Sequence, residues 1–225
     1  MEFDIVIILA FVAVVVIFIQ LRNVLGKRVG FERPPFDPYT STRTDSAIEK
    51  EPPASEVQSA DVLAQIDEAA RSNSVLHKGL KEIFVEDPNF SPRSFLGGAR
   101  VAYEAILTAF ACDDRQTLNA LLAPEALESF VAALKQRETA GERVEFRFVS
   151  IEEADFVAAG LEGNYAAITI RLVSQIISAT YNAEGHLVDG NPEEIVEIRD
   201  LWTFARNTKS EDPNWRLRHT EEDKR

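Results

Sequence analysis

The sequence predicts an α+β protein that begins with a membrane-spanning helix. Three observations carry this prediction. An unbroken apolar run extends from Ile5 to Ile19. Between residues 61 and 140 apolar side chains recur every three or four positions, the period of an amphipathic helix; after Gly141 they alternate, the period of a strand. Helices followed by antiparallel strands favour helices packed on one face of a curved sheet.

The N-terminal apolar run is long enough to cross a bilayer. As a helix, Phe3 to Leu21 would reach roughly 28 Å, close to the ~30 Å hydrocarbon core. A cleavable signal peptide is disfavoured because the leading residues include Glu2 and Asp4 and no small-x-small cleavage site follows the run. A buried core helix is disfavoured because no polar stripe crosses the run. Residues 1–22 are therefore predicted to be a retained membrane anchor, whose apolar surface includes Ile5, Val12 and Ile19.

Basic residues lie on only one side of this predicted anchor. No lysine or arginine precedes it, and four follow it closely: Arg22, Lys27, Arg28 and Arg33. The positive-inside rule then places the N-terminus outside and residues 22–225 in the cytoplasm, or in the matrix of an organelle of bacterial descent. The single cysteine, Cys112, agrees, because it cannot form an internal disulfide. The predicted location is the inner (cytoplasmic) membrane, with a single pass.

Residues 23–60 are predicted to be a disordered, proline-rich linker. They include Pro34, Pro35, Pro38, Pro52 and Pro53. With few large apolar residues after Tyr39, the segment cannot bury enough apolar area to offset the entropy of ordering it. Residues 61–225 form the predicted domain. The chain has a formal charge of −13, which argues against a nucleic-acid partner and against spread-out binding to anionic lipid.

Helices are predicted between residues 61 and 140. Two amphipathic stretches, 61–71 and 75–85, come first. Ser91 can cap a longer helix that has Pro92 in its first turn, and the pair Gly97-Gly98 inside that helix suggests the close approach of another element. Two shorter helices begin near Asp113-Asp114 and at Pro124, and Gly141 follows the last of them.

Strands are predicted in the remaining part of the chain. Val144, Phe146 and Phe148 alternate with charged residues, and residues 165–181 form a long stretch rich in Ile, Val and Thr. A turn is expected at residues 182–185. Two more strands are expected at 195–205 and 215–219.

The sequence contains no pattern typical of a metal or cofactor site. Its three histidines are far apart, and it has neither a Cys-x-x-Cys pair nor a phosphate-binding glycine loop. Asp200 is the one candidate catalytic base, because apolar residues share its strand face and burial would raise its pKa. The favoured interpretation is nevertheless a structural role, so no catalytic residue is assigned. Aromatic side chains near Asp200 either fill the core or line an apolar pocket that could hold an acyl chain or an apolar peptide. The candidate pocket residues are Phe146, Phe148, Asp200, Trp202 and Phe204.

Six motifs follow one another in an order that resembles a known family. They are Asp87-Pro-Asn-Phe90, Ser94-Phe-Leu-Gly-Gly-Ala99, Ala109-Phe110 with Asp113 and Leu118, Arg137-x-x-x-Gly141, Asp200-Leu-Trp-Thr-Phe204 and Asp212-Pro-Asn-Trp215. Together they resemble the C-terminal domain of the translocase-of-the-inner-membrane subunit 44 family, over about residues 61–220. An N-terminal span followed by this domain looks like the bacterial, membrane-anchored members.

The resemblance implies a cone-shaped fold of the nuclear-transport-factor-2-like (NTF2-like) kind, in which helices cover a bent sheet. It also implies a non-enzymatic adaptor that binds chaperones or client polypeptides at the inner membrane. The first two helices of the domain are implied to contact anionic lipid, through Leu63, Ile66, Leu76, Leu80, Ile83 and Phe84. Two alternatives are an enzyme of the same fold with Asp200 as its base and a ribosome-tethering module.

Overall fold

The computed structural model describes residues 54–71 and 73–224. Its helices are α2 (Ala54–Ala70), α3 (Ser74–Glu86), α4 (Pro92–Cys112), α5 (Arg115–Leu121) and α6 (Pro124–Ala140). Its strands are β1 (Arg143–Glu162), β2 (Tyr165–Tyr181), β3 (Leu187–Gly190), β4 (Val196–Asn207) and β5 (Arg216–Glu222). This element order confirms the mixed helical and antiparallel fold class. The predicted anchor, with Ile5, Val12 and Ile19, and most of the predicted linker lie outside the described residues.

The first described helix begins earlier than the sequence predicted. Helix α2 starts at Ala54, so the last residues of the predicted 23–60 linker are helical. The proline pair Pro52-Pro53 suggested a linker, but proline is compatible with the start of a helix, where its missing N–H has no intrahelical partner.

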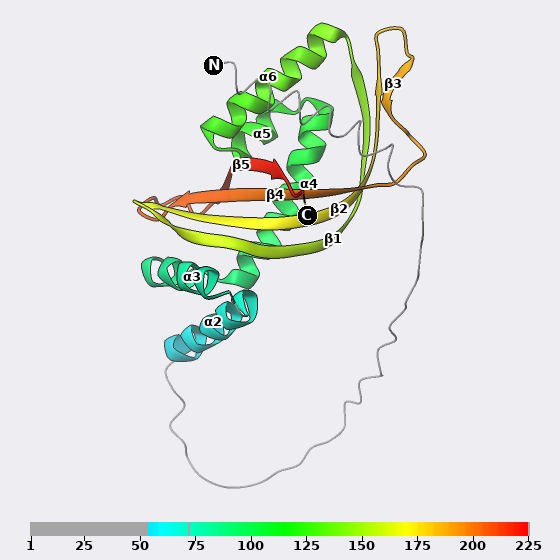
Figure 1. The fold of residues 1–225 in the computed structure, drawn as a ribbon. Helices are drawn as coiled ribbons and strands as arrows, with labels where there is room; N and C mark the ends of the chain where they lie inside the picture. The colour runs from blue at the N-terminus through cyan, green and yellow to red at the C-terminus, as the bar shows by residue number, and fades with distance from the viewer. Residues whose placement is uncertain (1–53, 72, 225) are drawn as a thin grey trace, which may run out of the picture.

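The sheet is antiparallel throughout, in the order β1-β2-β4-β5, with β3 paired to the end of β2. Strands β1 and β2 are the longest, at 20 and 17 residues. Their register shifts after Phe148, Ile151 and Phe156. Such bulges bend a strand and increase its twist. In Figure 1 both strands curve upward at one end, beside β3 and α6.

The helices pack at both edges of this sheet. Helices α2 and α3 lie on the β1 side, where α3 packs against β1, and α5 and α6 lie on the β5 side (Figure 1). Helix α4 runs from one group to the other and contacts α2, α5 and β1. The largest fully buried side chains come from the helices and from the sheet: Ile66, Leu80, Ile83, Tyr103, Ile106, Leu118, Leu122, Leu134, Ile168, Ile170, Leu172 and Phe204.

The predicted helix ends are confirmed by their caps. The Ser91 hydroxyl accepts a hydrogen bond from the Ser94 N–H at the start of α4, and Pro92 follows in the first turn. Asp114 caps α5 in the same way, through the Thr117 N–H. Gly141 ends α6 at a φ of 66°, which glycine adopts without steric cost.

The glycines that allow a close approach are not the predicted ones. Gly97 and Gly98 are exposed, and a Cβ atom built on either would meet nothing within 4 Å. The close approach occurs at Gly79 on α3, where such a Cβ atom would lie 1.9 Å from the carbonyl oxygen of Ala159. The prediction for Gly97-Gly98 was therefore wrong, and Gly79 instead allows α3 to rest on the backbone of β1.

We expect Gly79→Ala to destabilise the domain by about 1–3 kcal/mol, because the added methyl group would force α3 away from β1. Gly98→Ala is the matched control, since alanine is the better residue in an open helix interior and should raise stability by about 0.5–1 kcal/mol. Urea unfolding of both variants measures the two changes. Equal stability of the two variants would contradict the close packing of α3 on β1.

Candidate functional site

The predicted pocket residues belong to a filled region rather than to one cavity. Trp202 and Phe204 are 3% and 1% exposed. Phe148 is partly buried against the core, and Phe146 lies outside that core cluster. Two hollows on the described residues are lined by other residues, which belong to α4, α5 and α6. The packing therefore favours the filled-core alternative over the open apolar pocket.

Aromatic side chains fill this region. The Tyr103 ring lies 4.5 Å from the Trp202 ring, centroid to centroid, in an edge-to-face arrangement, and 6.1 Å from the Phe148 ring. Phe95 on α4 also belongs to this set, with its ring centroid 6.0 Å from that of Phe204 on β4. Pairs of this geometry each contribute about 0.5–1.5 kcal/mol beyond their burial. The cluster thus stabilises the packing of α4 on the sheet.

A polar cluster lies inside this aromatic region. The Tyr103 hydroxyl on α4 donates a hydrogen bond to a carboxylate oxygen of Asp200 on β4, at 2.7 Å. It lies 2.9 Å from the hydroxyl of Ser174 on β2. Tyr103 and Ser174 are fully buried, and Asp200 is 7% exposed. All three polar groups therefore satisfy one another inside the core.

Sequence reasoning identified Asp200 but missed its partner. No partner for Asp200 was evident from the sequence, because Tyr103 lies 97 positions earlier in the chain. The signal was present, because Tyr103 is the one residue with a hydroxyl group in the buried apolar stripe of α4. Periodicity could place Tyr103 on the buried face of a helix, but only the tertiary fold shows which strand it meets.

Burial changes the acid–base properties of this cluster. The pKa of Asp200 is raised to about 6, chiefly by desolvation and further by the nearby negative charge of Glu222, while the hydrogen bond from Tyr103 opposes the rise. The pKa of Tyr103 is raised as well, first by burial and then by the charge of Asp200. Tyr103 therefore stays protonated and acts as a donor. Asp200 has the pKa of a general base but is almost inaccessible to a substrate, which favours its structural role.

The residues predicted to contact lipid mostly face the core. Ile66, Leu76, Leu80 and Ile83 are at most 2% exposed, Phe84 is half-buried, and Leu63 is 38% exposed. The apolar stripes of α2 and α3 are therefore used for packing within the domain. These four side chains are covered by the rest of the domain in this structure, and lipid contact through the first two helices stays a prediction.

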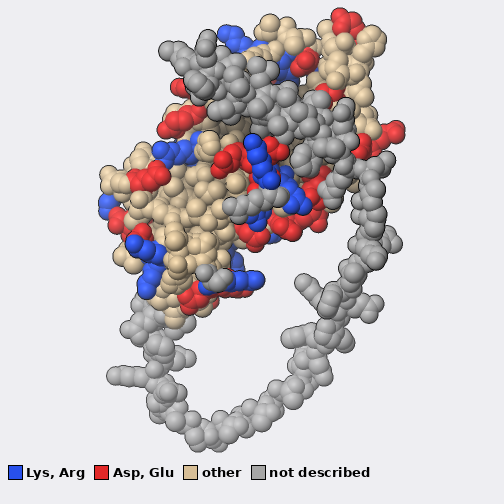
Figure 2. All heavy atoms as spheres, viewed as in Figure 1, with Lys and Arg blue, Asp and Glu red and all other residues tan. Residues whose placement is uncertain are grey.

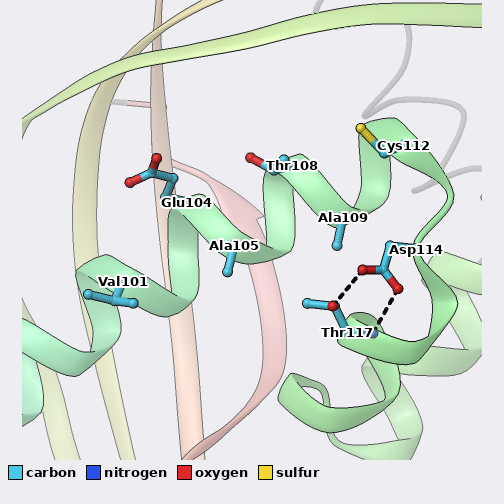
Figure 3. Close-up of a pocket in the computed structure, with 8 residues that line it drawn as sticks. All are labelled: Val101, Glu104, Ala105, Thr108, Ala109, Cys112, Asp114 and Thr117. Atoms are coloured by element: carbon cyan, nitrogen blue, oxygen red, sulfur yellow. Dashed lines mark hydrogen bonds between the residues drawn. The ribbon is translucent and has the colours of Figure 1, made fainter.

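A shallow groove with a volume of about 420 Å³ lies between α4 and α5; we call it the α4–α5 groove (Figure 3). Val101, Ala105 and Ala109 line it from α4, and Thr117 lines it from α5. Figure 3 shows Asp114 hydrogen-bonded to Thr117 at one end. Sequence reasoning missed this groove, because the small residues that form it look like ordinary helix-packing positions.

The described residues show no grouping of three or more His, Cys, Asp or Glu side chains that could hold a metal ion. His77 is paired with Asp67 at 2.8 Å on the surface of α2 and α3. In Figure 2 acidic and basic side chains are interspersed over the visible face.

Among the described residues, one helix is long and apolar enough to cross a membrane, and that helix is α4. Its buried residues include Phe95, Tyr103 and Ile106, which pack against the rest of the domain. We therefore interpret α4 as the core helix of a globular domain. The predicted anchor at residues 1–22 lies in the part of the chain that the structure does not describe.

Three solved structures resemble part of this chain at a distance. The intermembrane-space region of the chloroplast protein ARC6 has a TM-score of 0.40 at 8% identity, over 56% of this chain and 95% of that chain. A conserved protein from Planctomyces limnophilus has a TM-score of 0.30 at 21% identity, over 53% and 88%. A protein described as a dehydratase of the NTF2-like family from Streptomyces avermitilis has a TM-score of 0.30 at 15% identity, over 59% and 99%. No curated protein matches the chain.

A family model identifies the domain. The model described as the Tim44-like domain matches residues 76–222, which is well over half of the chain. This range contains all six motifs on which the predicted resemblance depended, and the match confirms that resemblance. The chain therefore belongs to the Tim44-like domain family.

Proposed function

We propose that this chain is a membrane-anchored adaptor whose domain binds chaperones or client polypeptides at the cytoplasmic face of the inner membrane. The family match over residues 76–222 carries the proposal. At the level of the family it supports a membrane-associated scaffold related to protein import, and the family is generally non-enzymatic. The cone-shaped, NTF2-like arrangement of helices on the curved sheet is part of the same proposal.

The buried position of Asp200 supports binding rather than catalysis. A general base must come within hydrogen-bond reach of the proton that it removes. Asp200 is 7% exposed, and its hydrogen-bond partner Tyr103 is fully buried. A substrate would have to displace the aromatic core to reach this carboxylate. An adaptor needs only the outer surface of the domain, which the core supports.

We infer that lipid contact is made by the outer face of α3, since the inner face is buried. This outer face carries Val75 and Val85, which are 77% and 73% exposed. Between them lie Lys78 and Lys81, and Lys78 is 3.7 Å from Glu82 in an exposed ion pair. Exposed valines flanking lysines suit a shallow contact with an anionic bilayer surface.

Site-specific photocrosslinking in native membranes tests the adaptor function. A photoreactive residue is placed at Val75 or Val101, both strongly exposed, with Glu184 in the β2–β3 turn as the control position. We expect polypeptides to be captured at one or both apolar positions and not at Glu184. Recovery of only a small metabolite at every position would overturn the adaptor proposal.

The Asp200→Asn variant separates the adaptor from an enzyme. Because Asp200 is buried, we expect this variant to capture the same polypeptides as the wild-type chain. Unchanged capture would show that the function does not require Asp200, which is the only candidate base. Loss of capture in a variant that remains folded by circular dichroism would contradict a purely structural role for Asp200.

The single cysteine provides a test of topology. Cys112 is exposed in the domain, and it is the only cysteine of the chain. A membrane-impermeant maleimide should therefore leave intact spheroplasts unlabelled and should label Cys112 in inverted membrane vesicles. Labelling in intact spheroplasts would place the domain on the opposite side of the membrane and contradict the proposed orientation.

A further inference from the structure

The α4–α5 groove has an apolar floor. Val101 on its α4 wall is 70% exposed, whereas the other large apolar residues of α4 are buried or partly buried. Ala105 and Ala109 follow at one-turn intervals, and their short side chains leave the hollow that Figure 3 shows between α4 and α5. The groove can therefore receive an apolar side chain that approaches the α4 backbone closely.

Both charged residues that line this groove within the described part of the chain, Glu104 and Asp114, are acidic. Glu104 on α4 is exposed and makes no hydrogen bond or ion pair with any residue that the structure describes. Asp114 accepts hydrogen bonds from the Thr117 N–H and hydroxyl, which lower the pKa of its carboxyl group and keep it ionised. An occupant of the groove must therefore combine apolar side chains with positive charge. A second copy of this chain is disfavoured, because two such grooves would repel each other.

One segment of the chain itself has this chemistry. Residues 22–33, which we call the basic segment, carry four basic residues and a single acidic one, Glu32. Their apolar residues are Val24, Leu25, Val29 and Phe31. This composition complements an apolar groove between carboxylates.

The chain between the basic segment and the domain is long enough for them to meet. Residues 34–53 could span up to roughly 70 Å if fully extended, whereas a domain of this size has a radius of gyration of about 15 Å. A tether of this kind gives an effective concentration on the order of 1 mM. Even a weak contact is therefore substantially occupied within one molecule.

We infer that the basic segment docks in the α4–α5 groove of its own chain, with an apolar side chain over Ala105 and with cationic side chains beside Glu104 and Asp114. In this arrangement the domain is held close to the membrane anchor. The contact does not depend on which partner the adaptor binds.

Disulfide trapping in the full-length chain, reconstituted in lipid nanodiscs, tests this contact. Cys112 lines the groove and is the only native cysteine. A second cysteine is introduced as Leu25→Cys in the basic segment or, as the control, as Ser46→Cys nearer to the domain in sequence. Under mild oxidation we expect Leu25→Cys to form an intramolecular disulfide at least several-fold faster than Ser46→Cys. Equal rates, or a disulfide formed mainly between two chains, would overturn the inference.

Reversing the charge of Glu104 shows whether its carboxylate attracts the basic segment. We expect Glu104→Lys to slow trapping of Leu25→Cys by about fivefold, since it replaces an exposed attraction with a repulsion. The matched control, Glu184→Lys, makes the same charge change outside the groove and should leave the rate unchanged. Adding Lys27→Glu and Arg28→Glu to Glu104→Lys should restore the rate. If Glu104→Lys did not slow trapping, the charge complementarity would be contradicted. The adaptor proposal would still stand, because the trapping assay does not measure binding of a partner.

Discussion

Arg206→Met is expected to destabilise the domain by about 3 kcal/mol, because it removes one member of a largely buried ion pair. The Arg206 guanidinium on β4 is paired with the Asp87 carboxylate, and these side chains are 13% and 14% exposed. The guanidinium also stacks on the Trp215 ring at 5.4 Å and donates to the Pro213 carbonyl oxygen. In the variant Asp87 would remain buried without its cation. Urea unfolding at neutral pH measures the loss.

An exposed ion pair in the same sheet serves as the control for Arg206. Arg218 is 2.8 Å from Glu162, and these side chains are 40% and 65% exposed, so Arg218→Met should cost no more than about 1 kcal/mol. A double variant, Arg206→Met with Asp87→Asn, should be less destabilised than the sum of its single changes, since no uncompensated charge remains. A loss for Arg206→Met no larger than that for Arg218→Met would contradict the stabilising role of the buried pair.

The domain is expected to lose stability as the pH rises from about 4 to about 6, through Asp200. The pKa of Asp200 is about 6 in the folded chain, against an ordinary value of 3.8 for a solvated aspartate, so the folded protein binds the proton more tightly than the unfolded chain. The stabilisation is therefore complete below about pH 4 and is lost as the pH rises through 6. A difference of about two pKa units corresponds to about 3 kcal/mol. Unfolding by urea across this range measures the slope.

Asp200→Asn isolates this contribution, because asparagine stays neutral and its carbonyl oxygen can still accept the Tyr103 hydrogen bond. Relative to the wild-type chain, we expect the variant to become more stable as the pH rises from 4 to 6. Above pH 6 the difference in the free energy of unfolding should be constant. Other carboxylates titrate in both proteins and cancel in this difference. A difference that does not change with pH would show that Asp200 is ionised in the core throughout this range.

The two Asp-Pro-Asn motifs show how the tertiary structure explains a sequence pattern. The sequence places Asp87-Pro-Asn and Asp212-Pro-Asn at the ends of separate elements, as ordinary turns. In the fold both turns meet at Arg206, which pairs with Asp87 and donates to the carbonyl oxygen of Pro213. Turn chemistry alone predicts where each segment ends, but the shared arginine requires contacts between residues more than a hundred positions apart.

Strand β1 shows where periodicity fails. The alternation of Val144, Phe146 and Phe148 predicted only the first part of this strand, which in fact continues to Glu162. Each bulge inserts an extra residue and inverts the alternation that follows it. Strand β2 has no such shift against β4, and its predicted limits, residues 165–181, are confirmed.

The sequence by itself determined that helices precede antiparallel strands, the helix ends at Ser91 and Gly141, and the family, because these depend on local period, capping residues and motifs. It did not predict the short strand β3 or the Asn73 cap of α3. Tertiary structure decided which faces are buried. It placed the apolar stripes of α2 and α3 in the core, paired Asp200 with Tyr103, and placed the tight helix–strand contact at Gly79. The physical reason is that periodicity shows that a face is apolar but not what covers it, and the covering surface comes from residues distant in the chain.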